Sequence, residues 1–109
     1  MNLKLIIAAT IVSAAIGFSQ VGAAQTAPTI SISAQNLMFS PATITVKAGA
    51  TVTWVNRDEE PHTIFNDAGL FRSSALDTNE SFSFTFDKPG TYHYVCTIHP
   101  RMTGTIIVE

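Results

Sequence analysis

The sequence predicts an all-β fold, an antiparallel sandwich or barrel, for the part of the chain that follows residue 24. Short runs of alternating apolar and polar residues recur along this part, as in half-buried strands. Glycine and proline separate the runs, which is typical of strands joined by tight turns. No apolar repeat of helical period and useful length follows residue 24. The 109 residues leave room for one small domain.

Residues 1–24 have the layout of a secretory signal peptide. Lys4 gives the charged start, the apolar run LIIAATIVSAAIGF follows, and the small residues VGAA end the segment. We expect cleavage after Ala23 or Ala24, which leaves residues 25–109 as one exported domain. An uncleaved membrane anchor is the weaker interpretation, because the run is shorter than the roughly 20 residues that span a bilayer. No stable membrane insertion is therefore expected after the signal is removed.

The expected strands follow one another through the rest of the chain. In the run SFSFTF, three phenylalanines alternate with polar residues, so all three should point to one face. Residues 57–80 are the least regular segment, and any short helix is expected there. The strands are expected within residues 29–34, 42–50, 51–56, 81–86, 91–96 and 103–109.

The charges exclude two classes of partner. Five basic and eight acidic residues follow residue 24, and they form no basic run or patch. Nucleic acid and anionic lipid surfaces attract clustered positive charge, so neither is an expected partner.

The chain has one cysteine, and its neighbours suggest a metal site. Cys96 ends a predicted strand, and His99 and Met102 follow on the tight loop that leads to the last strand. His62, in the loop after residue 56, offers a second imidazole. Two histidines and a cysteine with a long axial methionine define the blue copper electron-transfer site. A metal would also stabilise a small domain that cannot form an internal disulfide.

Each of these residues has a simpler interpretation when it is taken alone. Cys96 and Met102 can be buried apolar residues, and either histidine can be a surface residue. A structural zinc site uses cysteine and histidine without methionine, and a c-type haem needs a second cysteine before the histidine. The combination of four donors, three of them on one short loop, favours copper. The third histidine, His93, lies an odd number of residues from Cys96 and should face the other side of its strand.

The segments TVTWVNRDEEPHT and GTYHYVCTIHPRMTGTIIVE resemble the cupredoxin family of blue copper proteins. The C-x2-H-x2-M spacing is that of its short-loop members, the amicyanin-like proteins, and the similarity to these and to plastocyanin-like proteins runs from about Phe39 to Glu109. The resemblance implies an eight-stranded Greek-key β-sandwich. It also implies one copper ion held at one end of the sandwich by His62, Cys96, His99 and Met102, and electron transfer in the periplasm.

The sequence departs from the family pattern at three places. Thr63 stands where members often carry an asparagine that ties the two ligand loops together, and its hydroxyl is expected to donate a similar but shorter bond. Glu60 and Arg101 alter the apolar docking surface around the exposed ligand. Val95 stands where plastocyanins place a tyrosine, at a second electron exit. These changes leave the expected fold and metal unchanged and alter the surface that a redox partner would contact.

Two functions compete for such a site. The first is a soluble, monomeric one-electron carrier, not an enzyme, that docks redox donors and acceptors through the surface around His99. The alternative is a periplasmic copper-handling protein, a chaperone or a store, with the same ligands. A methionine-rich segment would favour the alternative, and residues 25–109 contain only Met38 and Met102. An enzyme would need an open coordination position, and four filled donors leave none.

Overall fold

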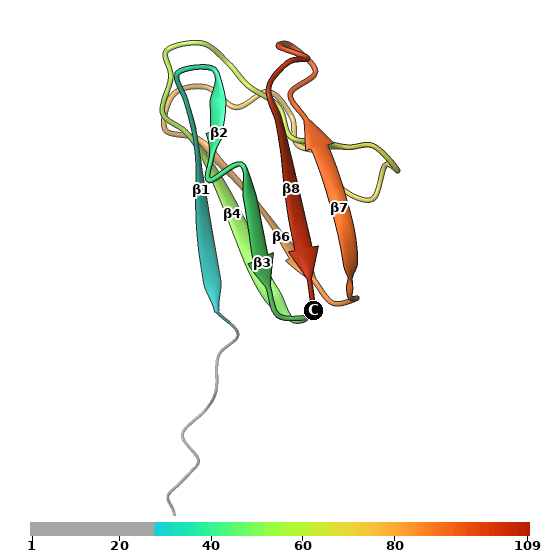
Figure 1. Cartoon of the computed structure of the whole chain (residues 1–109). Helices are drawn as coiled ribbons and strands as arrows, with labels where there is room; N and C mark the ends of the chain where they lie inside the picture. The colour runs from blue at the N-terminus through green and yellow to red at the C-terminus, as the bar shows by residue number, and fades with distance from the viewer. Residues whose placement is uncertain (1–27) are drawn as a thin grey trace, which may run out of the picture.

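The computed structural model describes residues 28–109, which form eight β-strands and no helix (Figure 1). The expected signal peptide lies outside the described residues. The strands are β1 (Thr29–Gln35), β2 (Met38–Ser40), β3 (Thr43–Val46), β4 (Ala50–Asn56), β5 (Phe65–Asn66), β6 (Ser81–Phe86), β7 (Gly90–Val95) and β8 (Thr103–Val108). The all-β prediction is confirmed.

The strands form two four-stranded sheets that face each other as a sandwich. One sheet has the order β2-β1-β4-β6 and the other the order β3-β8-β7-β5. The chain crosses from one sheet to the other at each step from β2 to β7. In Figure 1, the turn after β1 and the loop between β7 and β8 both lie at the upper end of the sandwich.

The expectation of purely antiparallel sheets is wrong for two strand pairs. β1 runs parallel to β4, and β3 runs parallel to β8, while the other pairs are antiparallel. Apolar alternation reports which face of a strand is buried and carries no information about its neighbours. Because the chain changes sheets between consecutive strands, neighbours within a sheet are often distant in sequence and are free to run parallel.

The expected strands appear close to their predicted limits, and the irregular segment differs from expectation. Residues 57–80 hold no helix. They contain the two-residue strand β5 and two isolated bridges, His62 with Leu76 and Phe65 with Arg72. These bridges pair the two halves of the segment with each other. The pairing of β5 with β7, Phe65 opposite Val95, holds the segment against the sandwich near the end of β7.

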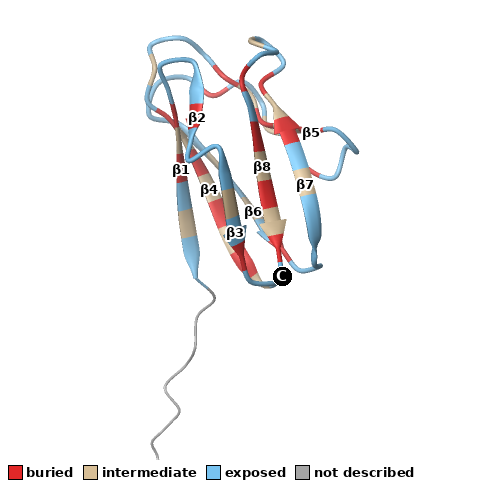
Figure 2. Ribbon diagram, viewed as in Figure 1, coloured by how far each residue is buried: buried red, intermediate tan, exposed pale blue. Residues whose placement is uncertain are grey.

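The core lies between the sheets and is centred on Trp54. Along β4, alternate residues are buried, and Trp54 is fully buried (Figure 2). Its ring lies 5.3 Å from the Tyr94 ring and 5.8 Å from the rings of Phe71 and Phe82, measured between centroids. Aromatic pairs at such distances contribute beyond the burial of their area. The packing holds β4 against β7, the two strands that lead into the candidate metal centre.

Gly104 lets the Tyr94 ring lie flat on the neighbouring strand. The two residues are paired across β7 and β8, and a Cβ atom on Gly104 would lie 2.2 Å from Cζ and Oη of Tyr94. The ring cannot retreat easily, because Phe39 and Trp54 pack against it at centroid distances of 4.8 and 5.3 Å. A side chain at position 104 would therefore overpack the core next to Cys96.

We expect Gly104→Ala to lower the free energy of unfolding by about 1–3 kcal/mol, the usual cost of overpacking a filled core. Urea unfolding of the metal-free protein measures this loss. Thr103→Ala, at the exposed neighbouring position on β8, is the control and should change stability by less than about 0.5 kcal/mol. Equal stability of Gly104→Ala and the native protein would contradict the close contact between the Tyr94 ring and position 104.

Candidate metal centre

The candidate donors lie on two loops at the upper end of the sandwich. His62 lies on the loop between β4 and β5, and Cys96, His99 and Met102 lie on the loop between β7 and β8. Two backbone bonds close the second loop: the amide of Cys96 donates to the carbonyl of Met102 at 2.9 Å, and the amide of Met102 donates to the carbonyl of His99 at 2.8 Å. This short closed loop holds three candidate donors with little conformational freedom.

The structure brings the sulfur and the two imidazoles together. The Sγ atom of Cys96 lies 3.7 Å from Nδ1 of His62 and 3.9 Å from Nδ1 of His99. One ligand atom from each of the three residues lies within 4.8 Å of the others. His62, Cys96 and Met102 are buried, and the side chain of His99 is 28% exposed. Three of the four predicted donors thus form one cluster, in which only His99 is partly open to solvent, and Met102 is buried on the same loop as Cys96 and His99.

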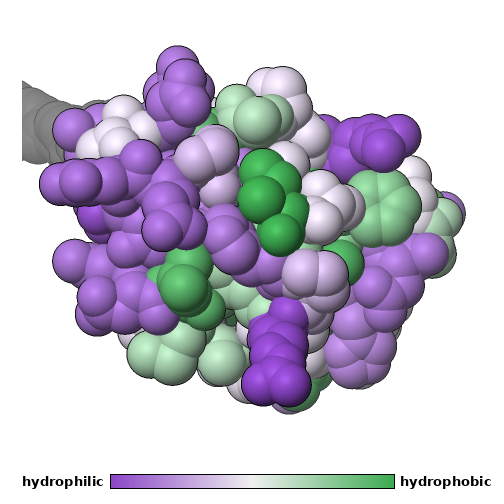
Figure 3. Space-filling view, turned by 90° about the horizontal axis from the view of Figure 1, so that it is seen from above, coloured by the Kyte–Doolittle hydropathy of each residue, from purple (hydrophilic) through white to green (hydrophobic). Residues whose placement is uncertain are grey.

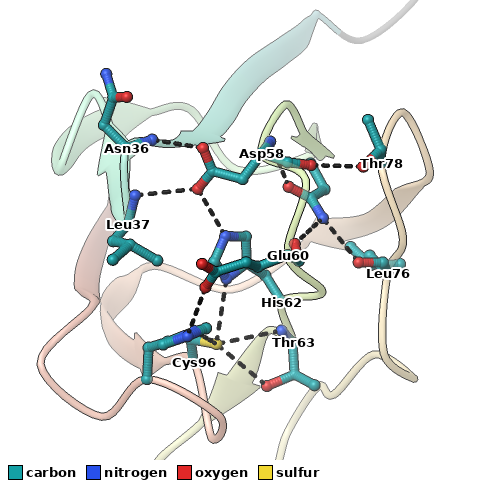
Figure 4. Close-up of polar contacts among 11 residues, drawn as sticks. Asn36, Leu37, Asp58, Glu60, His62, Thr63, Leu76, Thr78 and Cys96 are labelled. Atoms are coloured by element: carbon teal, nitrogen blue, oxygen red, sulfur yellow. Dashed lines mark hydrogen bonds and ion pairs between the residues drawn. The ribbon is translucent and has the colours of Figure 1, made fainter.

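Asp58 orients His62. Its Oδ2 atom accepts a hydrogen bond from Nε2 of His62 at 2.8 Å and one from the Leu37 amide at 3.0 Å, and Oδ1 accepts one from the Asn36 amide at 2.7 Å (Figure 4). With the Nε2 proton held by the carboxylate, Nδ1 faces the Cys96 sulfur. A carboxylate in this role fixes the tautomer and ring orientation of a metal-binding histidine.

The pKa values of the Asp58–His62 pair follow from these contacts. Burial acts to raise the pKa of Asp58, but the Leu37 amide and His62 outweigh it, so that this pKa lies below its ordinary value. Burial acts to lower the pKa of His62, and the bonds to Asp58 and Cys96 outweigh it, so that this pKa lies above its ordinary value. The pair therefore favours a carboxylate beside a protonated ring in the metal-free protein.

Asn56 holds the loop that carries Asp58 and His62. Its buried side-chain amide donates to the carbonyls of Glu60 and Leu76, both at 2.8 Å, and its oxygen accepts from the Asp58 amide at 2.8 Å. A buried amide with its donors and acceptor satisfied fixes the surrounding backbone. Sequence analysis missed Asn56 and Asp58 as supporting residues. The available signal was a carboxylate four residues before a candidate ligand on the same loop.

Thr63 is linked to the second loop, as expected, but the direction of the backbone bond differs from the expectation. The Thr97 amide donates to Oγ1 of Thr63 at 2.8 Å, so that Thr63 accepts this bond. The amide of Thr63 also donates to the Cys96 sulfur at 3.4 Å. Burial acts to raise the pKa of the Cys96 thiol, but the bonds from Thr63, His62 and His99 lower it from 9.0 to about 6. The site thus favours the thiolate, the form that binds metals.

The surface around His99 is a groove with apolar walls and a charged rim. Its lining includes Leu37, Ile98 and Pro100, together with Arg101. Leu37 is 46% exposed and Ile98 is 44% exposed, and apolar side chains lie open among polar ones at this end of the molecule (Figure 3). His99 lines the same groove, so that the partly exposed edge of the cluster opens into it.

Glu60 contacts the partly exposed candidate donor, whereas His93 lies outside the cluster. The Oε1 atom of Glu60 lies 3.1 Å from Nε2 of His99, so that the departure at position 60 contacts the exposed candidate donor. His93 is exposed on β7, and its Nδ1 atom lies 3.1 Å from Oγ1 of Thr105. The prediction that His93 faces away from Cys96 is confirmed.

The chain matches the sequence profile described as "Cupredoxin-like domain" over residues 6–108. It therefore belongs to the cupredoxin family. It is 34% identical to amicyanin-alpha of Methylorubrum extorquens, over 94% of this chain and 92% of that protein. It is 42% identical to the plastocyanin of Scenedesmus fuscus, over 67% of this chain and 88% of that protein. The solved Cu(I) form of an amicyanin variant superposes with a TM-score of 0.71 at 33% identity, over 81% of this chain and 87% of that one.

The residues present fit copper better than the other metals considered. The cluster offers one thiolate and two imidazole nitrogens, with a buried methionine on the same closed loop. Thiolate and thioether are soft donors that suit Cu(I), and imidazole suits both oxidation states of copper. Structural zinc sites do not use methionine.

We expect Asp58→Asn to weaken copper binding about 10–100-fold, the usual effect of losing a residue that supports a metal ligand. The neutral amide holds the Nε2 proton of His62 less firmly, so that the ring is less well oriented. Competition with a copper chelator measures the affinity. Asp87→Asn, at an exposed aspartate on the turn between β6 and β7, is the matched control. Equal affinities of the native and Asp58→Asn proteins would contradict the role of Asp58.

In the metal-free protein, the Cys96 thiol should titrate with a pKa of about 6. Because this folded-state pKa is depressed from 9.0, the ionised thiol stabilises the fold above about pH 9, and this contribution is lost as the pH falls through about 6. Ultraviolet absorbance of the thiolate follows the titration, with Cys96→Ser as the blank. An ordinary thiol pKa would show that the hydrogen bonds on the sulfur do not form.

Proposed function

We propose that the chain is a blue copper protein that carries single electrons and binds one copper ion per chain through His62, Cys96, His99 and Met102. The observation that carries the proposal is the meeting of a thiolate sulfur and two imidazole nitrogens within 4.8 Å of one another. Such a group placed at the end of a cupredoxin-like sandwich, with a buried methionine beside it, is the donor set of a type 1 copper site.

Copper, when it is bound, supplies the one-electron change between Cu(I) and Cu(II). The protein's part is to hold the donors in one arrangement for both states. The closed loop between β7 and β8 fixes three of them, and Asp58 fixes the ring of His62. Because the supporting contacts are buried or part-buried, little rearrangement accompanies the change of charge.

His99 is the proposed point of electron exchange. It is the one candidate donor with an exposed side chain, and it lies in the groove lined by Leu37, Ile98 and Pro100. A redox partner with an apolar surface would bury these side chains and bring its own centre close to the ring edge. Four filled donors leave no position for a substrate, so we propose that the protein is a carrier and not an enzyme.

The proposed location is the periplasm. It rests on the layout of residues 1–24 as a signal peptide, which would leave residues 25–109 as the exported copper-binding domain. Within residues 28–109, the structure contains no helix with the length and apolar character that a membrane crossing requires. We propose that the mature protein works as a monomer and docks redox proteins as donor and acceptor, with no role for nucleic acid.

Adding Cu(II) to the purified mature protein tests the function. One equivalent should bind and produce an intense visible thiolate-to-copper charge-transfer band. Cys96→Ser should abolish the band, because a serine hydroxyl is a harder donor that does not ionise as a thiol does. His93→Gln, at the exposed histidine outside the cluster, is the control and should keep the full band. A colourless one-to-one copper complex of the native chain would overturn the proposal.

A further inference from the structure

Two threonine hydroxyls join the ligand loops immediately beside the Cys96 sulfur. Thr63 follows His62 on the first loop, and Thr97 follows Cys96 on the second. Their Oγ1 atoms lie 2.8 Å apart, and the Oγ1 atom of Thr63 lies 3.8 Å from the sulfur. Thr63 is half-buried and Thr97 is exposed. We propose that Thr97, acting through Thr63, is a positioning residue that directs the Thr63 hydroxyl proton onto the Cys96 sulfur.

The Thr63 hydroxyl has as many donor and acceptor sites as it has contacts. A hydroxyl has one proton to donate and two lone pairs that accept. The backbone amide of Thr97 can only donate, and it occupies one lone pair of the Thr63 oxygen at 2.8 Å. One proton and one lone pair remain for the two other contacts, which are the Thr97 hydroxyl and the Cys96 sulfur.

Only one arrangement satisfies both remaining contacts. If Thr63 donates to the sulfur, its second lone pair accepts the proton of the Thr97 hydroxyl, and every contact is a hydrogen bond. If Thr63 donates to Thr97 instead, a lone pair of Thr63 faces the electron-rich sulfur. A thiolate accepts hydrogen bonds and repels lone pairs, so its charge selects the first arrangement. The Thr97 hydroxyl then polarises the Thr63 hydroxyl, which strengthens the bond to sulfur.

The sulfur thereby receives two hydrogen bonds from one residue. The Thr63 amide donates at 3.4 Å and the Thr63 hydroxyl at 3.8 Å. The asparagine that often stands at this position has a separate carbonyl and amide, so that its donors and acceptor are fixed in different directions. A threonine has a single proton, whose direction depends on its neighbour. The identity of residue 97 therefore matters more in this chain.

The consequence for copper rests on the proposed function. Hydrogen bonds on the sulfur draw electron density away from the metal and favour the more electron-rich Cu(I) state. Loss of the Thr63 hydroxyl bond should shift the redox equilibrium about tenfold toward Cu(II), which lowers the reduction potential by about 59 mV. Loss of the Thr97 hydroxyl should lower the potential in the same direction and by less, because only the polarisation is lost.

Four variants of the copper-loaded protein test the proposal by voltammetry and visible spectroscopy. Thr63→Val removes the donor, and Thr63→Ser should restore the potential. Thr97→Val replaces the hydroxyl with a methyl group but keeps the backbone amide bond to Thr63, so that a merely structural link between the loops is retained. Thr85→Val is the matched control, because Thr51 and Thr85 form the same hydroxyl pair at 2.8 Å between β4 and β6.

The expected result is a lower potential and a shifted charge-transfer band in Thr63→Val, with a smaller change of the same sign in Thr97→Val and none in Thr85→Val. An unchanged potential in Thr63→Val would overturn the bond to sulfur. An unchanged or raised potential in Thr97→Val would overturn the role of Thr97, since a raised value means that Thr97 competes for the proton.

Neutron diffraction from deuterium-exchanged crystals of the metal-free protein, kept above about pH 9 so that even an ordinary thiol is ionised, decides the proton position without copper. Deuterium on Thr63 directed at the Cys96 sulfur, with the Thr97 deuterium directed at Thr63, supports the proposal. Deuterium on Thr63 directed at Thr97 overturns it. A native protein that binds no copper or gives no visible band would contradict the proposed function. The neutron experiment would still test the direction of the Thr63 proton, because it does not depend on copper.

Discussion

The site depends on hydrogen-bond partners for the polar groups that are buried at the end of an apolar sandwich. His62 and Cys96 are inaccessible to solvent, and a buried polar group without partners would cost about 1–3 kcal/mol. Each has partners: Asp58 holds the far nitrogen of His62, and Thr63 donates to the Cys96 sulfur. The bond from Thr63 joins the loop between β4 and β5 to the residue that follows β7, so that the loop cannot move away from β7 without removing a hydrogen bond from the buried sulfur.

The apolar core fixes the other half of the cluster. Cys96 directly follows β7, and β7 is positioned by Tyr94, whose ring packs between Trp54 on one sheet and Gly104 on its own. Tyr94 is two residues before Cys96, and alternate residues of a strand share a face. The packing that buries the tyrosine ring therefore also points the cysteine inward. The position of β7 thus determines both the packing of Tyr94 in the core and the position of Cys96 in the cluster.

The sequence was sufficient for the parts of the structure that depend on local pattern. Alternation located the long strands, and the softness and spacing of Cys96, His99 and Met102 indicated the metal. It was not sufficient for the features that depend on pairing. The parallel neighbours of β1 and β3 follow from crossovers between sheets, which alternation does not report. The role of Asp58 depends on the amides of Asn36 and Leu37, about twenty residues earlier in the chain. The need for glycine at position 104 appears only once Tyr94 is known to lie opposite.

The loop after β4 supplies a carboxylate to each of the two histidine rings, and the two carboxylates hold their rings with different strength. Both rings turn Nδ1 toward the sulfur and Nε2 toward a carboxylate, and both carboxylates, Asp58 and Glu60, come from the loop after β4. The carboxylate of Asp58 is 15% exposed and accepts two further bonds from backbone amides, so that its hold on His62 is rigid. Glu60 is 61% exposed, and exposed contacts of this kind contribute only about 0–1 kcal/mol and weaken with salt. Moving Glu60 away from His99 therefore costs little, whereas displacing Asp58 from His62 would break a network that also holds the turn between β1 and β2. The difference in burial between two carboxylates, two residues apart, holds one ring firmly and leaves the other partly open to solvent.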